Sequence, residues 1–223
     1  MTESFTAEDR ALAAWEIVAA STSALAAEWV VFAVVGGGGT LALMFPVVTA
    51  AAFMLLSHRV RGESAREVGW RLDNFGEAAR LLLPPMLAVS AALVGFGWYA
   101  GTLDFGRWEG GQSILGVPAL SIFWGPLQQY ALQGFINRRA QILLGRGGLS
   151  VLLVGLLFGL FHLPNPWLTL ATFVAGLFWA WVYQRAPNIL AVGASHGLMT
   201  WMLISSVPPS ALQNLRVGYK FFG

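Results

Sequence analysis

Long stretches without charged side chains recur along this chain and are separated by short polar segments. Asp, Glu, Lys and Arg are absent from residues 29–58, 81–103, 110–137, 147–184 and 186–215. A helix that crosses the roughly 30 Å hydrocarbon core of a bilayer needs about 20 apolar residues. Because the longest stretches have room for two such helices, the pattern predicts about seven membrane-spanning helices.

We expect these helices to cover about 12–35, 40–57, 81–100, 114–135, 149–162, 167–184 and 188–206. Gly36 to Gly39 end the first helix. The sequence Leu163-Pro164-Asn165-Pro166 ends the fifth, because proline lacks a backbone donor and clashes with the preceding turn. The predicted fold class is therefore all-α, a polytopic transmembrane helical bundle. We expect residues 1–223 to form one integral membrane domain.

The composition supports a membrane location. Of the 223 residues, 57% are hydrophobic and 11% are charged, whereas a soluble domain has roughly 25% charged residues. A soluble fold of this size could not bury so much apolar surface. The chain has no cysteine, which excludes disulfides and thiolate metal sites, and its net charge of +2 is too small to suggest a nucleic-acid partner. Membrane lipids are the expected surroundings.

The segment 59–80 differs from the rest because its charges are dense and of both signs. Trp70 and Leu72 are the large apolar side chains in its second half. A helix lying along the cytoplasmic membrane interface would fit this composition. A solvated loop would fit it equally well, and the sequence leaves both interpretations open.

The distribution of basic residues predicts the orientation. With seven crossings and the N-terminus inside, ten of the 13 basic residues lie in inside segments. The three in outside segments are Arg107, Arg216 and Lys220. Cytoplasmic loops carry an excess of Lys and Arg. We therefore expect an integral membrane protein of the bacterial inner (plasma) membrane with a cytoplasmic N-terminus.

A few polar side chains interrupt the apolar helices, and such residues are costly in a membrane unless they have a function. Four lie in the fourth predicted helix, one ends the fifth and two lie in the seventh. They are Gln128, Gln129, Gln133 and Asn137, then His162, then His196 and Thr200. Side chains four positions apart share a helix face, so the fourth helix carries a face of amides, with Gln128 about 100° away from it.

These residues resemble the motifs of the CPBP intramembrane proteases, which include type II CAAX prenyl endopeptidases and Abi-like relatives. The segment 128–139, with Gln128, Gln129 and Gln133, resembles the family's EExxxR-G motif. Phe158 and His162 match FxxxH, and the segment from His196 to Thr200 resembles HxxxN. Order and spacing agree over about residues 60–206. The resemblance implies an intramembrane endopeptidase whose first Glu activates water and whose His and Asn side chains position it.

This sequence departs from the family at the acids. Gln128 and Gln129 replace the two Glu, Gln133 replaces the Arg, and Thr200 replaces the Asn. An amide donates and accepts hydrogen bonds but takes no proton near neutral pH. Because both acids and the Arg are replaced together, no buried charge is left without a partner, which indicates a site rebuilt as neutral.

Another acid could replace the missing base only from the first half of the chain, since all 11 acidic residues lie at or before Glu109. Glu28 is the best candidate and Glu16 the second. The alternative is that Glu28 marks a helix end or reaches toward the membrane surface. The residues themselves indicate no metal site and no cofactor, because two His are fewer than the three or four protein ligands zinc usually has. Zinc stays open through the family resemblance only.

Three functional hypotheses remain. The first is an endopeptidase of the CPBP type in which Gln128, His162 and His196 are central and Gln129, Gln133 and Thr200 support them. The second is a catalytically silent relative that binds a peptide, lipid or isoprenoid-like ligand, with an immunity or chaperone role. The third is a small transporter or structural membrane protein. A membrane-embedded or lipidated peptide is the expected partner for the first two.

Overall fold

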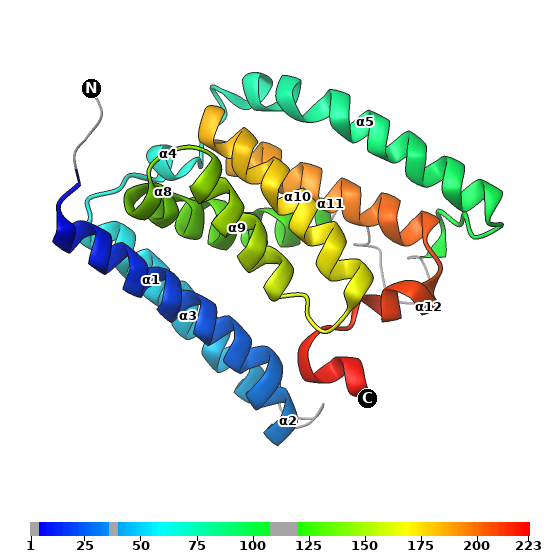
Figure 1. The fold of residues 1–223 in the computed structure, drawn as a ribbon, viewed down its shortest axis with the longest axis horizontal. Helices are drawn as coiled ribbons and strands as arrows, with labels where there is room; N and C mark the ends of the chain where they lie inside the picture. Colours follow the sequence, from blue (N-terminus) through cyan, green and yellow to red (C-terminus); the bar gives the residue numbers. More distant parts are fainter. Residues whose placement is uncertain (1–4, 36–39, 108–119) are drawn as a thin grey trace. The chain divides into compact units, whose positions relative to one another are not determined.

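A computed structural model describes residues 5–35, 40–107 and 120–223. This part of the chain is helical and contains no strand (Figure 1). Several helices contain π-helical turns. From Leu120 to Leu144 the chain is one continuous helix in which π-helical and α-helical elements alternate, in the order η4, α7, η5 and α8. The longer elements are α1 (Ala7–Leu25), η1 (Ala26–Val31), α2 (Phe32–Val35), α3 (Thr40–Val60), α5 (Phe75–Tyr99), η4 (Leu120–Trp124), α7 (Gly125–Gln129), η5 (Tyr130–Asn137), α8 (Arg138–Leu144), α9 (Gly148–Leu160), α10 (Pro166–Arg185) and α11 (Ile189–Ser206). The short ones are α4 (Ala65–Val68), α12 (Pro209–Leu212), η6 (Gln213–Leu215) and η7 (Gly218–Phe222).

Each of the seven predicted helices has a counterpart, which confirms the all-α fold class. The third begins earlier than predicted, at Phe75, and the fourth continues to Leu144. The predicted start of the fourth, at 114, lies outside the described residues. In the segment 59–80, neither interpretation holds throughout: α3 runs on to Val60, α4 is a single turn, and α5 starts at Phe75.

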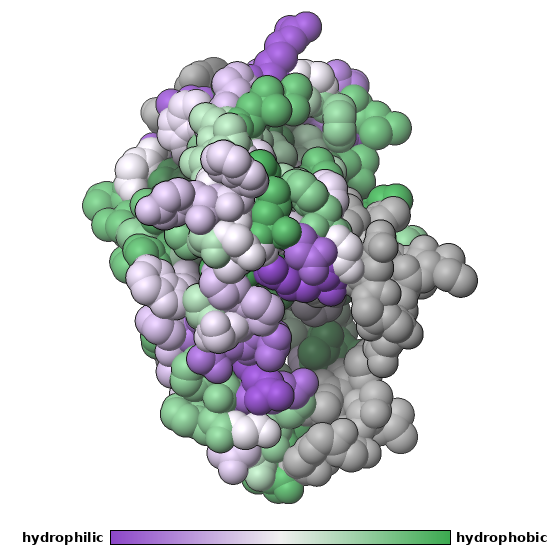
Figure 2. All heavy atoms as spheres, turned by 90° about the vertical axis from the view of Figure 1, so that its right-hand side faces the viewer, coloured by the Kyte–Doolittle hydropathy of each residue, from purple (hydrophilic) through white to green (hydrophobic). Residues whose placement is uncertain are grey.

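Four helices are long and apolar enough to cross a membrane: Ala7–Val34, Phe75–Tyr99, Pro166–Arg185 and Ile189–Ser206. Large apolar side chains lie on their outer surfaces, and Figure 2 shows such side chains in green on one face. Trp15 is 72% exposed and Trp98 is 78% exposed. A water-soluble protein rarely exposes so many large apolar side chains. These surfaces fit a helical membrane bundle.

The chain forms two compact units. The first contains residues 1–64, 131–181 and 215–223, and the second contains 65–130 and 182–214. In the first unit, α1 lies beside α3 and also contacts α8 (Figure 1). In the second unit, α11 packs against α5, α7 and η4. Each unit holds part of the residues that the sequence singles out.

Small residues bring α9 and α10 close together in the first unit. The sequence has Gly155 and Gly159 at GxxxG spacing, which predicts close helix packing within the chain. A Cβ atom added to Gly176 would lie 3.1 Å from the Gly155 Cα atom. A Cβ atom at Gly159 would lie 3.2 Å from the Phe173 Cβ atom. The prediction is confirmed, because the two helices approach at their glycines.

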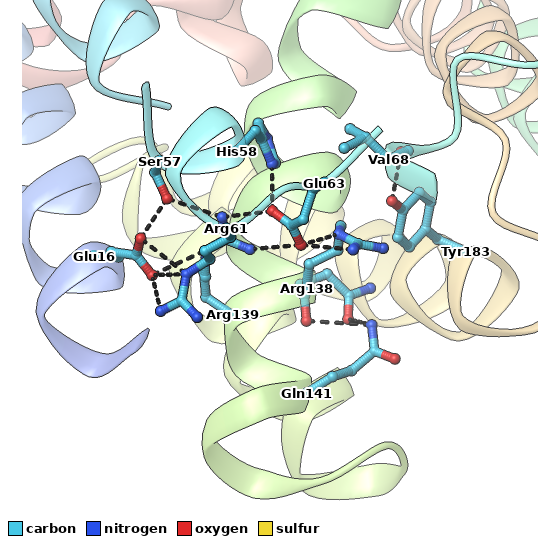
Figure 3. A network of polar contacts seen from close by, with 11 residues as sticks. Glu16, Ser57, His58, Arg61, Glu63, Val68, Arg138, Arg139, Gln141 and Tyr183 are labelled. Atoms are coloured by element: carbon cyan, nitrogen blue, oxygen red, sulfur yellow. Dashed lines mark hydrogen bonds and ion pairs between the residues drawn. The ribbon is translucent and has the colours of Figure 1, made fainter. Parts of the chain in front are cut away.

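A buried ionic network joins α1, α3 and α8 with the loop after α3 (Figure 3). Glu16, predicted from the sequence as a second stand-in for the missing base, is committed to this network. Its Oε2 atom lies 2.8 Å from Arg61 Nη2 and 2.9 Å from Arg139 Nε. Its Oε1 atom accepts a hydrogen bond from Ser57 Oγ. Glu16 therefore serves as a structural counter-ion in this network.

Glu63 is the second acid of the network. It lies 2.6 Å from Arg138 Nη2, 2.8 Å from Arg139 Nη2 and 2.6 Å from His58 Nδ1. Burial alone would raise the pKa of Glu63. The hydrogen bonds from His58 and Arg139 and the two Arg charges outweigh it and hold that pKa well below its ordinary value of 4.5. Arg139 is fully buried between the two acids, so the network pairs every charge that it removes from solvent.

Candidate functional site: a neutral amide and histidine pair

The close approach of α7 and α11 places two of the predicted site residues together in the second unit. A Cβ atom at Gly193 would lie 2.6 Å from the Pro126 backbone nitrogen, so only glycine allows this spacing. One turn further along each helix, Gln129 Nε2 lies 3.1 Å from His196 Nδ1. Gln129 is fully buried and His196 nearly so. The helix contact therefore creates a polar pair shielded from solvent.

The pair is neutral in this arrangement. The Gln129 amide nitrogen donates to Nδ1, which requires an imidazole whose proton is on Nε2. The carbonyl oxygen of Gln129 is also buried and has no hydrogen-bond partner among the described residues. An unpaired buried acceptor costs about 1–3 kcal/mol. The pair thus presents a buried acceptor that an N–H group of a ligand can satisfy.

We expect Gly193→Ala to disturb this pair directly. The new methyl group would overlap the Pro126 backbone, and overpacking of this kind typically costs about 1–3 kcal/mol. The measurements are thermal unfolding in detergent and the histidine side-chain NMR signals of the labelled protein. Gly95→Ala is the control, because a Cβ atom there meets nothing within 4 Å. An unshifted His196 signal in Gly193→Ala would contradict the packing argument.

Two other predicted residues lie near this pair in sequence but are less engaged. Gln128 is half-buried, and Thr200 is half-buried one turn beyond His196 on α11. Neither makes a hydrogen bond within the part of the chain that the structure describes. The amide that meets a histidine is therefore Gln129, although the family resemblance places the catalytic position at Gln128. The predicted roles of both residues stay predictions.

His162 lies in the first unit, in the turn that follows α9 instead of in the helix itself. Its Nδ1 atom lies 2.7 Å from the Phe158 carbonyl oxygen. Its ring packs edge-to-face against the Phe158 ring, with the centroids 4.8 Å apart. The motif spacing of four residues thus holds the imidazole in a fixed orientation, with Nδ1 as the donor and Nε2 as the acceptor.

Gln133 is part of a ladder of amides along the helix from η5 into α8. The Asn137 amide nitrogen donates to Gln133 Oε1 at 2.8 Å and to the Ala180 carbonyl oxygen at 3.2 Å. Gln141 Nε2 donates in turn to Asn137 Oδ1 at 3.2 Å. Gln141 was not among the predicted site residues, although its position continues the four-residue spacing. Gln133 and Asn137 are fully buried, as expected for the predicted amide face.

Within the part of the chain that the structure describes, no carboxylate forms an ion pair with His162. Glu28 lies in η1 of the same unit, and its Oε2 atom is buried without a hydrogen-bond partner among the described residues. No ion pair joins Glu28 to His162 there. Among the described residues, no three His, Asp or Glu side chains gather as metal ligands. Because amides stand where the family's motifs have acids, this donor set does not fit zinc.

Comparison with known proteins supports the motif resemblance. Residues 110–202 match the family described as type II CAAX prenyl endopeptidase Rce1-like. The match shows similarity over this stretch only, which we call the Rce1-like region. No curated protein and no solved structure matches the chain. The Rce1-like region contains all three motifs, including Gln128, His162 and His196, and it does not extend over residues 60–109, where the sequence resemblance was also expected.

Proposed function

We propose that this CAAX-protease-like membrane protein binds a lipidated or membrane-embedded peptide and does not cleave it at an appreciable rate. The observation that carries this proposal is the neutral Gln129–His196 pair, with its 3.1 Å contact. A glutamine cannot act as a general base near neutral pH. Loss of general-base catalysis typically lowers the rate by about 10²–10⁴-fold. The same residues remain suited to hydrogen bonding.

The buried Gln129 carbonyl oxygen supports a binding role. It has no partner among the described residues, and a peptide N–H group would satisfy it. In an apolar site a hydrogen bond to a ligand contributes more than one exposed to water, because water competes less. The Rce1-like region points to the ligand class, a peptide that carries a lipid or enters the membrane.

We place the protein in a bacterial inner membrane with its N-terminus in the cytoplasm. The support is the excess of basic residues in the segments that would then face inside. The charged network of Glu16, Glu63 and three Arg would lie at that same side. Fusion of a cytoplasm-active reporter to the N-terminus tests the orientation.

The test of the function is binding and cleavage of a prenylated peptide by the purified protein in lipid nanodiscs. We expect binding without product, and we expect Gln129→Leu to weaken binding by about 5- to 10-fold, the effect of one hydrogen bond of roughly 1 kcal/mol. Gln213→Leu, at an exposed position, is the control. Cleavage that His162→Ala abolishes would show an endopeptidase instead. Absence of both binding and cleavage would reject the proposal.

A further inference from the structure

The C-terminal segment 216–222 contacts the turn that carries His162. Gly218 N–H donates to the Leu163 carbonyl oxygen at 2.8 Å. Asn165 Nδ2 donates to the Arg216 carbonyl oxygen at 3.2 Å. Figure 1 shows this red segment next to the yellow loop that follows α9. The residues directly after His162 are therefore held by one main-chain hydrogen bond and one from the Asn165 side chain to a segment more than 50 residues away in sequence.

The same segment docks on the first helix. A Cβ atom at Gly218 would lie 2.7 Å from the Glu28 carbonyl oxygen. Lys220 Nζ lies 3.9 Å from the centroid of the Phe32 ring, and the Phe222 and Trp29 rings lie 6.2 Å apart. A cation over an aromatic ring and a pair of aromatic rings are both attractive contacts. The segment is thus fixed at both ends of its η7 turn.

Gly218 is the point where these two sets of contacts meet. It is buried and its φ is +56°, a conformation that residues with a Cβ atom rarely adopt. We propose that Gly218 is a positioning residue for His162: by bridging Glu28 and Leu163 it fixes the turn that presents the imidazole to the ligand. This inference rests on the proposed function only in its last step, the contact of the His162 imidazole with the ligand, which we add to that proposal.

The substitutions Gly218→Ala and Gly218→Asn test the proposal. Both add a Cβ atom against Glu28, but Asn tolerates positive φ better than Ala. If Gly218 holds the turn because its lack of a Cβ atom allows the contact with Glu28, both variants release the turn. If Gly218 holds it through the positive φ, Ala releases the turn more than Asn does. Either result supports the positioning role. Gly223→Ala is the control, since nothing lies within 4 Å of its Cβ position.

The readout is modification of each histidine by diethyl pyrocarbonate, followed by mass spectrometry of the protein in detergent. We expect His162 to react about fivefold faster in the Gly218 variants than in the wild type. A modest destabilisation of the turn that carries His162 would produce this change, because the turn would open more often. His58 and His196 should keep their rates. Equal His162 rates in wild type and both variants would overturn the proposal. A rise at all three histidines would overturn it too, because it shows general unfolding.

A milder variant covers the case in which Gly218 substitutions prevent folding. Lys220→Met removes the cation over the Phe32 ring without adding bulk, and it should raise the His162 rate alone. An unchanged rate in this variant would count against the positioning role. Because the readout needs no peptide, failure of peptide binding would reject the proposed function and leave this inference standing.

Discussion

Gln128→Glu is expected to raise the rate of prenylated-peptide cleavage from background by about 10²–10⁴-fold, the usual contribution of a general base. The carboxylate would stand at the position of the first Glu in the protease motif that residues 128–139 resemble. Gln128 is half-buried and makes no hydrogen bond within the described ranges, so the substitution breaks no hydrogen bond there. Product formation by the purified variant, followed by mass spectrometry, measures the gain.

Two further variants show whether a gain comes from the site. Gln213→Glu places the same change at an exposed position and should leave the rate at background. Adding His162→Ala to Gln128→Glu should return the rate to background. If Gln128→Glu stays inactive although it folds and binds peptide, restoring one acid is not sufficient, because Gln133 and Thr200 still stand where the motifs have Arg and Asn.

Glu63→Gln is expected to lower the free energy of unfolding by about 3–5 kcal/mol, as breaking a buried ion pair typically does. The substitution leaves Arg139, which is fully buried, with one acid instead of two. It also removes the charge that Arg138 contacts at 2.6 Å. Chemical unfolding in detergent micelles, monitored by circular dichroism, gives the difference.

Glu77→Gln is the matched control, because Glu77 is exposed at the start of α5 and the change should stay within about 0.5 kcal/mol. The pH dependence gives a second check. Because the pKa of Glu63 is held below 4.5 in the folded protein, its contribution to stability is complete above that pH and is lost as the pH falls further. Below that pH, the free energy of unfolding of the Glu63→Gln variant should fall less steeply than that of the wild type. Equal losses in both variants would contradict the network argument.

The positions of the helices were predictable because lipid imposes one strong constraint. A spanning segment must exclude charge over about 20 residues, and α10 and α11 therefore lie within two residues of their predicted ends. The start of α5 was not predictable in this way, since Glu77 and Arg80 lie in its first turns. Charged residues at the end of a spanning helix extend it beyond the hydrocarbon, and a charge-free criterion cannot detect that extension.

The candidate site was predictable in its residue types and only partly in its geometry. The four-residue spacing correctly placed Gln129 and Gln133 on a buried face. It could not show that Gln129, and not Gln128, meets His196, because that contact depends on how closely Gly193 lets two helices approach. The ionic network was missed for a similar reason: Glu16 and Arg139 lie far apart in sequence, and only tertiary packing pairs them.

The amide ladder of Gln133, Asn137 and Gln141 has one consequence that the ionic network does not share. Its hydrogen bonds carry no net charge, so neither acid nor dissolved salt can weaken them by protonation or Debye screening. Acid well below pH 4.5 would disturb the Glu63 cluster first, because it protonates the carboxylate that pairs the Arg side chains. The amide ladder would keep its hydrogen bonds under conditions that weaken the ionic network of the same unit.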